Sequence, residues 1–340
     1  MPANILNWGI ELILSLQAAI GVWAVRPLNF FTSLGYQEFF MLFLPLIYWC
    51  WDSVLGVRVG IALFLSIGVN DLFKMGFNDP RPYWYDTRVD LLADPEPAFG
   101  LPSGHAQNAV VLWSVLAAHL RKNWAWAVAG ALAFLIGFSR IYLGAHFPTD
   151  VIVGWLIGIV LLYAFLRLEK RIWEAFKKYS AGKQVVVLLV VALAMIVASI
   201  ATVAVVRSTF EVPDEWALNA LAANEEAEIN PLTISVMITT MAVIFGMLAG
   251  VVWLGQRGGF DARGLAWKRI ARYVIGMVVL LAIYLGLDVL FSMLAEDETT
   301  LGYLLRFVRY GLLGLWVGGL GPAVFVRFGL ADKAQGVAAP

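Results

Sequence analysis

Long apolar runs separated by short polar stretches organise this chain. Each run is close to the ~20 residues that an α-helix needs to cross a bilayer, and few charges interrupt it. We therefore predict an all-α fold, a polytopic membrane helix bundle with about ten transmembrane helices. The predicted spans cover residues 5–25, 39–57, 59–76, 104–120, 123–140, 148–168, 184–206, 231–255, 270–295 and 303–328.

The polar stretches between the spans divide the chain into three predicted regions. Residues 1–168 form a six-helix core, and residues 184–340 form a four-helix membrane region to which the sequence assigns no role. Between them, residues 169–183 carry five basic residues after Glu169, with aromatic and aliphatic residues on one side. This pattern predicts an amphipathic helix on the membrane surface, and a solvated basic loop is the alternative.

Composition excludes several classes of protein. The chain is 61% hydrophobic and 14% charged, whereas soluble domains carry about 25% charged residues, so a soluble monomer and a disordered chain are both excluded. The 24 basic and 24 acidic residues balance, and no polybasic domain indicates a nucleic-acid partner. A single cysteine, Cys50, excludes an internal disulfide and a cysteine-based zinc site.

The distribution of Lys and Arg predicts an orientation. With a cytoplasmic N-terminus and ten spans, the larger share of the 24 Lys and Arg residues falls in cytoplasmic loops. Loops 77–103 and 141–147 then lie outside. We predict an integral membrane protein of a bacterial inner (cell) membrane, with its active site facing the periplasm or exterior.

Residues capable of phosphate chemistry gather at the outer ends of the third to sixth predicted spans. If the span count is right, segments more than seventy residues apart meet on one membrane face. Ionisable residues near membrane spans are costly and typically functional. The candidates are Lys74, Arg81, Ser103, Gly104, His105, Arg140, His146 and Asp150.

Five of these candidates predict a bound phosphate. The guanidinium groups of Arg81 and Arg140 match phosphate oxygens bidentately, and Lys74 adds a point charge. Ser103 and Gly104 stand at a predicted helix start, where free backbone N–H groups and the helix dipole favour an anion.

The other candidates add acid–base and nucleophilic chemistry. His105 and His146 supply imidazoles, and Asp150, one helical turn after His146, is suited to fixing an imidazole tautomer. The third histidine, His119, lies ~21 Å from His105 along the same predicted helix and is interpreted as an interfacial polar residue. No spaced carboxylate or histidine group of hard-cation type is present outside this set, so we predict no metal and no cofactor, with the cations neutralising charge instead.

These residues form a three-part signature. Together they resemble the signature of the type 2 phosphatidic acid phosphatase superfamily. The three parts are Lys74-x6-Arg81-Pro82, Pro102-Ser103-Gly104-His105 and Ser139-Arg140-x5-His146-x3-Asp150. The sequences around Arg81 and Arg140 are similar to the glucose-6-phosphatase branch in particular. The resemblance covers roughly residues 74–150 and implies a six-helix core.

The resemblance also implies a role for each residue. His146 would attack phosphorus and form a phosphohistidine, Asp150 would orient His146, and His105 would protonate the leaving oxygen and then activate water. The phosphate oxygens would be held by Lys74, Arg81, Ser103, Gly104 and Arg140.

The expected function is hydrolysis of a lipid phosphate or pyrophosphate of the undecaprenyl pyrophosphate, phosphatidate or phosphatidylglycerophosphate type, without metal. The expected partner is therefore a lipid phosphate in the membrane, and the oligomeric state stays open. Alternatives are a phosphatase of a small soluble phosphate, as in glucose-6-phosphatase, and a lipid phosphotransferase. A different class, a transporter or binding protein, is suggested by the four extra spans and by Asp288, a lone buried carboxylate within the ninth span. A satisfied interhelical hydrogen bond is an equal alternative interpretation of Asp288.

Two further polar groups have open structural interpretations. Glu11 and Gln17, within the first span, face either the bundle interior or a substrate groove, and structural pairing is the favoured interpretation. Asp71 lies within one turn of Lys74, where it either partners Lys74 or Arg81 or makes a hydrogen bond within the bundle.

Overall fold

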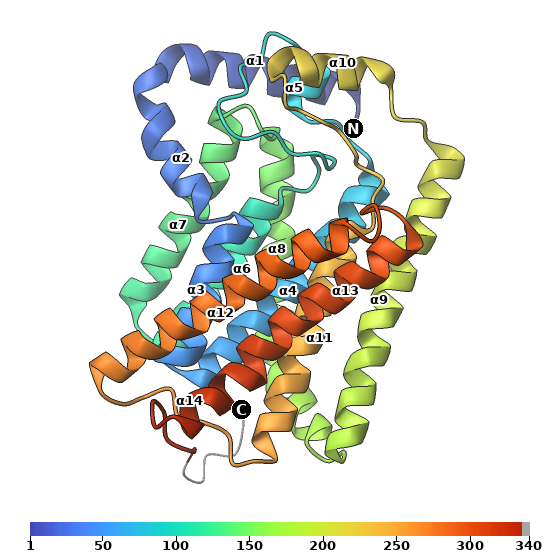
Figure 1. Cartoon of the computed structure of the whole chain (residues 1–340). Helices are drawn as coiled ribbons and strands as arrows, with labels where there is room; N and C mark the ends of the chain where they lie inside the picture. Colours follow the sequence, from blue (N-terminus) through green and yellow to red (C-terminus); the bar gives the residue numbers. More distant parts are fainter. Residues whose placement is uncertain (335–340) are drawn as a thin grey trace. The chain divides into compact units, whose positions relative to one another are not determined.

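The computed structural model describes residues 1–334, and this part of the chain is helical without any strand (Figure 1). The predicted all-α membrane bundle is confirmed. In chain order the elements are α1 (Ala3–Ile20), the 3-10 turn η1 (Val22–Ala24), α2 (Val25–Ser33), α3 (Gln37–Cys50), α4 (Ser53–Phe77), α5 (Pro82–Tyr85), α6 (Gly104–Leu120), α7 (Asn123–Tyr142), α8 (Pro148–Phe176), α9 (Ala181–Thr209), α10 (Asp214–Ala223), α11 (Ser235–Gly255), α12 (Ala266–Ser292), α13 (Thr300–Leu315), the π-helical turn η2 (Trp316–Leu320) and α14 (Gly321–Arg327).

The number of candidate membrane spans is slightly lower than the ten expected. Among the described residues, eight helices are long and apolar enough to cross a membrane, or nine if the bent pair Val22–Ser33 and Gln37–Cys50 counts as one span. The two parts of that pair meet at an angle of 49°. Helix α6, predicted as a span, is 17 residues long, which is at the short end of the range for crossing a bilayer.

Two helix boundaries differ from those predicted. Helix α3 ends at Cys50 and α4 begins at Ser53, within the predicted span 39–57, because the side chain of Asp52 accepts a hydrogen bond from the Leu55 amide at 2.9 Å and caps α4. Helix α8 continues to Phe176 and α9 starts at Ala181, so residues 169–183 do not form a helix of their own.

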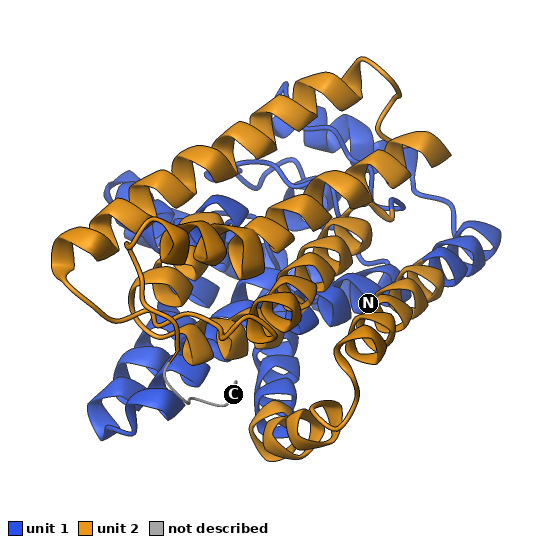
Figure 2. Cartoon of the chain, turned by 60° about the horizontal axis from the view of Figure 1, so that its bottom comes forward, with its two compact units in different colours: residues 1–40, 65–164, 200–233 blue, residues 41–64, 165–199, 234–340 orange. Residues whose placement is uncertain are grey.

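The chain divides into two compact units (Figure 2). Unit 1 comprises residues 1–40, 65–164 and 200–233, and unit 2 comprises residues 41–64, 165–199 and 234–340. The units therefore interleave along the sequence, and the division into consecutive regions at 168 and 184 stays a prediction.

In unit 1, the short helix α5 is covered by α10, which follows it by more than a hundred residues. The indole of Trp84 lies 6.1 Å from that of Trp216, centroid to centroid, and Asn219 donates a side-chain hydrogen bond to the Trp84 carbonyl at 2.9 Å. The Asn230 amide donates to the Pro97 carbonyl at 3.1 Å. Residues 210–232 thus hold both ends of the loop that follows α5.

Helix α1 also packs on loops of unit 1. Glu11 accepts a hydrogen bond from Arg88 at 3.0 Å, and the amide of Gln17 donates to the backbone carbonyls of Asp90 and Tyr142 at 2.8 and 3.1 Å. Both side chains therefore have structural partners in the loops, which agrees with the favoured interpretation of Glu11 and Gln17.

Unit 2 is built on close contact of α11 with α13 and η2. A Cβ atom at Gly246 would lie 2.0 Å from the carbonyl oxygen of Gly311, and one at Gly314 would lie 2.2 Å from that of Val243. Only glycine permits this backbone approach. The core of unit 2 surrounds Trp49, whose indole N–H donates to the Val317 carbonyl at 2.9 Å.

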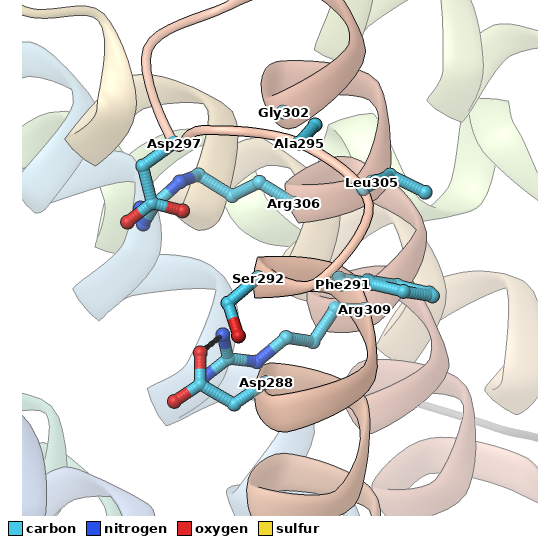
Figure 3. Close-up of a pocket in the computed structure, with 9 residues that line it drawn as sticks. All are labelled: Asp288, Phe291, Ser292, Ala295, Asp297, Gly302, Leu305, Arg306 and Arg309. Carbon is cyan, nitrogen blue, oxygen red and sulfur yellow. Dashed lines mark hydrogen bonds and ion pairs between the residues drawn. The ribbon is translucent and has the colours of Figure 1, made fainter.

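Two ion pairs join the end of α12, the following loop and α13 in unit 2. Figure 3 shows Asp288 facing Arg309, and Asp297 beside Arg306. The Arg309 side chain is 10% exposed and also lies over the rings of Tyr284 and Tyr310. Asp288 is 54% exposed and pairs with Arg309 of α13, so it is not a lone buried carboxylate, and the alternative interpretation, a satisfied interhelical hydrogen bond, agrees with the structure.

Candidate active site

The residues predicted to handle phosphate all lie in unit 1. They stand at helix ends or in the loops that join them. Lys74 is in the last turn of α4, Ser103 caps α6 and Arg140 is in the last turn of α7. The other candidate residues lie in or next to two loops, 78–103 and 143–147. The Leu92 amide donates a hydrogen bond to the Leu143 carbonyl at 3.0 Å, which joins the two loops.

His146 and Asp150 form the closest functional pair. Nδ1 of His146 lies 3.1 Å from Oδ2 of Asp150, and both side chains are fully buried. The same carboxylate oxygen accepts the backbone N–H of Phe147 at 3.0 Å, which fixes the carboxylate relative to the loop. Because a carboxylate only accepts, Nδ1 carries the proton and Nε2 presents its lone pair.

The guanidinium of Arg81 faces that lone pair. Its Nη1 lies 3.2 Å from Nε2 of His146 and donates to the Ala145 carbonyl at 3.1 Å. Its Nε donates to the Ala98 carbonyl at 2.6 Å. Arg81 is therefore held between the two loops, with its charge beside the imidazole.

Arg140 approaches from the end of α7. Its Nη1 donates to the hydroxyl of Thr32 at 2.7 Å, and its side chain is fully buried. The guanidinium also lies 5.9 Å from the centre of the Tyr36 ring. Residues of α2 and of the turn after it therefore orient Arg140, which the sequence did not indicate.

Glu96 lies between the two arginines. Its Oε2 accepts from Nη2 of Arg81 at 2.7 Å, its Oε1 accepts from Nη2 of Arg140, and Nδ1 of His105 is 3.8 Å from Oε1. One small anion is thus bound by two guanidinium groups beside both histidines. The sequence analysis did not single out Glu96, and the only local signal is its place between Pro95 and Pro97 in the polar loop.

His105 is in the first turn of α6, with its ring edge-on to that of Tyr36 at 5.0 Å. Its Nε2 is buried and has no hydrogen-bond partner within residues 1–334. Behind the ring, a Cβ atom at Gly35 would lie 2.3 Å from the His105 Cδ2 atom, so the glycine makes room for the imidazole.

Ser103, Gly104 and Lys74 are close to this group but have other immediate partners. The Ser103 hydroxyl accepts from the Ala106 amide at 3.4 Å, and its own amide donates to the Asp150 carbonyl at 2.9 Å. A Cβ atom at Gly104 would lie 3.0 Å from the side-chain oxygen of Asn70. The ammonium of Lys74 binds the carbonyl of Phe99, and the Gly100 carbonyl at 3.5 Å.

A buried polar network supports the start of α6. The amide of Asn70 donates to the Pro102 carbonyl at 3.3 Å and to the Gln107 side chain at 3.0 Å, and Gln107 in turn donates to the Ser66 carbonyl at 2.8 Å. Asp71 is buried with one carboxylate oxygen unpartnered among the described residues. The network therefore runs through Asn70 and Gln107, which sequence analysis did not assign to the site.

Charges within the site bias two protonation states. Burial alone would raise the pKa of the Glu96 carboxyl, but the charges of Arg81 and Arg140 hold that pKa well below its usual range. Burial, together with the charge of Arg81, holds the pKa of the His146 imidazole well below its usual range. At neutral pH Glu96 is an anion and His146 is neutral, which is the form in which Nε2 is nucleophilic.

The described residues contain no group of three or more His, Cys, Asp and Glu side chains arranged to hold a metal ion. The arrangement instead combines a carboxylate-oriented imidazole, two buried guanidinium groups and a second imidazole. These are the parts needed to bind an oxyanion and attack its central atom.

Known proteins share parts of this sequence. Residues 55–174 match the PAP2 superfamily, and residues 238–333 match the transmembrane extension of PAP2 superfamily phosphatases. Phosphatidylglycerophosphatase B of Bacillus subtilis is 36% identical over 86 residues, which cover 23% of this chain and 42% of that protein.

Two further relatives align over longer stretches. Undecaprenyl-diphosphatase of Sulfolobus acidocaldarius is 30% identical over 116 residues, covering 34% of this chain and 55% of the relative. Glucose-6-phosphatase catalytic subunit 1 of Haplochromis nubilus is 28% identical over 203 residues, covering 51% of this chain and 57% of the relative. The chain thus spans less than two thirds of the length of these relatives.

Proposed function

Because the chain belongs to the PAP2 superfamily, we propose that it is a membrane phosphatase that hydrolyses a lipid phosphate or lipid diphosphate. The observation that carries the proposal is the convergence of Arg81 and Arg140 on one small anion, the Glu96 carboxylate, beside Nε2 of His146. A phosphate at this point would present its phosphorus to the imidazole.

In the first proposed step, Nε2 of His146 attacks phosphorus in line with the leaving oxygen. The nitrogen–phosphorus bond forms, the phosphorus–oxygen bond breaks, and His105 gives its proton to the departing oxygen. Asp150 keeps the proton on Nδ1 and stabilises the positive charge that develops on the imidazole. The product is a phosphohistidine.

In the second step, His105 takes a proton from water, and the water oxygen attacks the phosphohistidine. The oxygen–phosphorus bond forms and the nitrogen–phosphorus bond breaks, which releases phosphate and restores neutral His146. Arg81 and Arg140, with Lys74, Ser103 and Gly104, neutralise the equatorial oxygens in both steps. Because these cations supply the positive charge, the proposed mechanism requires no metal ion.

A lipid substrate suits an integral membrane protein whose candidate residues stand at the ends of apolar helices. There, a headgroup could reach the residues while its chains stay in the bilayer. The relatives named for phosphatidylglycerophosphate and undecaprenyl diphosphate support this class of substrate. We place the site on the periplasmic or exterior face of a bacterial cell membrane, because most Lys and Arg residues fall in the opposite loops.

A small soluble phosphate is the second candidate substrate. The glucose-6-phosphatase relative aligns over 203 residues, the longest of the three stretches given above, and it favours this alternative.

The test is phosphate release by the purified protein in detergent, with EDTA present. Undecaprenyl diphosphate, phosphatidate, phosphatidylglycerophosphate and glucose 6-phosphate are compared at equal concentration. We expect turnover of at least one lipid, and acid-labile phosphate bound to the protein when a radiolabelled lipid reacts for a single turnover. His146→Ala should abolish both signals.

The matched control is His119→Ala, since His119 is 14 residues from His105 along α6, about 21 Å away. Its activity should equal that of the wild type. Release from glucose 6-phosphate alone would favour the second candidate, and full activity of His146→Ala would overturn the mechanism.

A further inference from the structure

Helix α1 contacts the same loops at both of its ends. The amino group of Met1 binds the carboxylate of Asp79, and Gln17, near the other end, donates to the carbonyls of Asp90 and Tyr142. An 18-residue α-helix is ~27 Å long, almost the thickness of the hydrocarbon core. If α1 crossed the bilayer, its two ends would lie at opposite faces.

The loops that α1 contacts belong to one end of unit 1. The Gly100 amide donates to the Asp79 carbonyl at 2.9 Å, and the Leu92 amide donates to the Leu143 carbonyl at 3.0 Å. Loop 78–103 and the turn between α7 and α8 are thereby joined. Figure 1 draws α1 across this end of the unit rather than beside α7 along its length.

The middle of α1 follows the same loops. Asn7 accepts from the Tyr85 hydroxyl at 3.0 Å, and Glu11 pairs with Arg88 at 3.0 Å. Its buried apolar side chains pack with Val89 and Phe147. Among described residues 34–334, the side-chain hydrogen bonds, ion pairs and core contacts of α1 therefore fall within residues 79–93 and 138–148.

The two faces of α1 differ in chemistry. Its buried residues recur at three- and four-residue spacing and are apolar or glycine, namely Leu6, Gly9, Ile10 and Ile13. Its exposed residues include a polar stripe at similar spacing, namely Asn4, Asn7, Glu11 and Ser15. A spanning helix would have to turn this stripe toward acyl chains, whereas a helix at the surface presents it to water and headgroups. Trp8, 53% exposed beside the stripe, is typical of the interface.

We propose that α1 is an interfacial helix that lies in the plane of the membrane surface, on the face that holds the candidate site. Its partner is the lipid headgroup layer of that leaflet, and Met1 lies on the same face. The bent pair of α2 and α3 is then the first segment to cross the bilayer.

This placement connects the membrane surface with the site. Phe147, which follows His146, packs on α1, and Asp79, which binds Met1, is two residues before Arg81. The ring of Phe147 leaves space only for hydrogen at Gly9, where a Cβ atom would lie 2.7 Å from Cδ1 of the ring. Headgroups that contact α1 thus touch a helix that packs directly on loop 143–147, which carries His146.

The test is labelling of single cysteines with a membrane-impermeant maleimide in intact cells and in inverted vesicles. In a Cys50→Ala background, the probes are Asn4→Cys and Ser15→Cys, both exposed. The references are Asp94→Cys, in loop 78–103, and Lys178→Cys, after the other end of α8. Each variant must elute as the wild type and react fully after denaturation.

We expect Asn4→Cys and Ser15→Cys to react from the same side as Asp94→Cys, and from the side opposite to Lys178→Cys. Reaction of Asn4→Cys from the same side as Lys178→Cys would overturn the proposal. Protection of Ser15→Cys from maleimide on both sides would also overturn it, because a spanning α1 places residue 15 within the bilayer. A second measurement is protease removal of an epitope fused before Met1, which should also occur from the Asp94 side. Neither readout depends on phosphatase activity.

Discussion

The carboxylate of Glu96 lies 2.7 Å from Nη2 of Arg81, where the proposed mechanism requires a phosphate oxygen. Arg140 binds the other oxygen of the same carboxylate. A substrate phosphate must therefore displace Glu96 or share its two guanidinium partners. Under the proposed mechanism, the loop that carries Glu96 would therefore affect phosphate binding even without touching the lipid chains.

Glu96→Gln should bind inorganic phosphate more tightly than the wild type, because the neutral amide competes less for Arg81 and Arg140. We expect about a tenfold lower Kd, equivalent to ~1.4 kcal/mol. Isothermal titration in detergent at pH 7 measures it. Asp94→Asn is the matched control, since Asp94 is an exposed carboxylate in the same loop. If Glu96→Gln binds phosphate as tightly as the wild type or more weakly, then Glu96 does not compete with phosphate for Arg81 and Arg140.

The contributions of His146 and Glu96 to stability should fall as the pH is lowered, in two stages. Because the pKa of His146 is depressed in the folded state, the unfolded chain binds a proton at a higher pH than the folded chain does. The contribution of neutral His146 to the free energy of unfolding is therefore complete above the unfolded pKa of about 6.5. It is lost as the pH falls from there toward the folded-state pKa. The depressed pKa of Glu96 likewise lowers the free energy of unfolding as the pH falls below about 4.3, the pKa of an unfolded glutamate. Tryptophan fluorescence during heating, from pH 8 to about pH 3, measures Tm.

His146→Gln is the control for the first stage, because glutamine does not titrate. Its Tm should stay flatter than that of the wild type between about pH 6.5 and pH 5. If the wild-type Tm does not fall relative to that of His146→Gln on acidification through this interval, the sign is wrong.

Gly35→Ala should impair activity through His105. The added Cβ would lie 2.3 Å from the imidazole Cδ2 atom, so the ring must move, and misplacement by about 1 Å costs as much as 100-fold in rate. We expect kcat to fall at least about tenfold while KM changes less.

Gly130→Ala provides the comparison, since a Cβ atom there has nothing within 4 Å. Its kcat should match the wild type. If Gly35→Ala and Gly130→Ala have the same kcat, then the position of His105 does not depend on Gly35.

Asp288→Asn should destabilise unit 2 more than Asp297→Asn does. Asp288 pairs with Arg309, which is 10% exposed, whereas the partner of Asp297 is the more exposed Arg306 and Asp297 itself is 76% exposed. Loss of the charge beside a nearly buried cation costs about 1–3 kcal/mol, and loss at an exposed pair costs about 0–1 kcal/mol. Denaturant-induced unfolding in mixed micelles compares the two. Equal losses would mean that burial of Arg309 is unimportant.

Much of the fold and of the candidate site could be predicted because both have local signals. Apolar runs of about twenty residues mark spans, and the side chains at their ends reach one face. That geometry was enough to bring Arg81, Arg140 and His146 together from segments far apart in sequence. The roles assigned to them stay proposals.

The parts of the fold and the site that could not be predicted depend on tertiary contacts, which leave no periodic pattern in the sequence. Glu96 meets Arg140 across 44 residues and Arg81 across 15, and neither separation corresponds to a helical or strand repeat. Gln17 and Glu11 interrupt one apolar run and are interpreted as structurally paired, but nothing in the sequence identifies their partners in the loops. Hydropathy alone likewise cannot separate a helix that crosses a membrane from one that lies on it.

The cover formed by α10 over α5 has a consequence for biosynthesis. The loop with Arg81 and Glu96 is fastened by Trp216, Asn219 and Asn230, which leave the ribosome more than a hundred residues later. Until then the nascent chain already contains every proposed catalytic side chain but lacks the segment that anchors this loop. The loop therefore cannot be fastened until translation has passed the seventh predicted span, residues 184–206, and a fragment ending at residue 168 would carry the whole motif without its fastening.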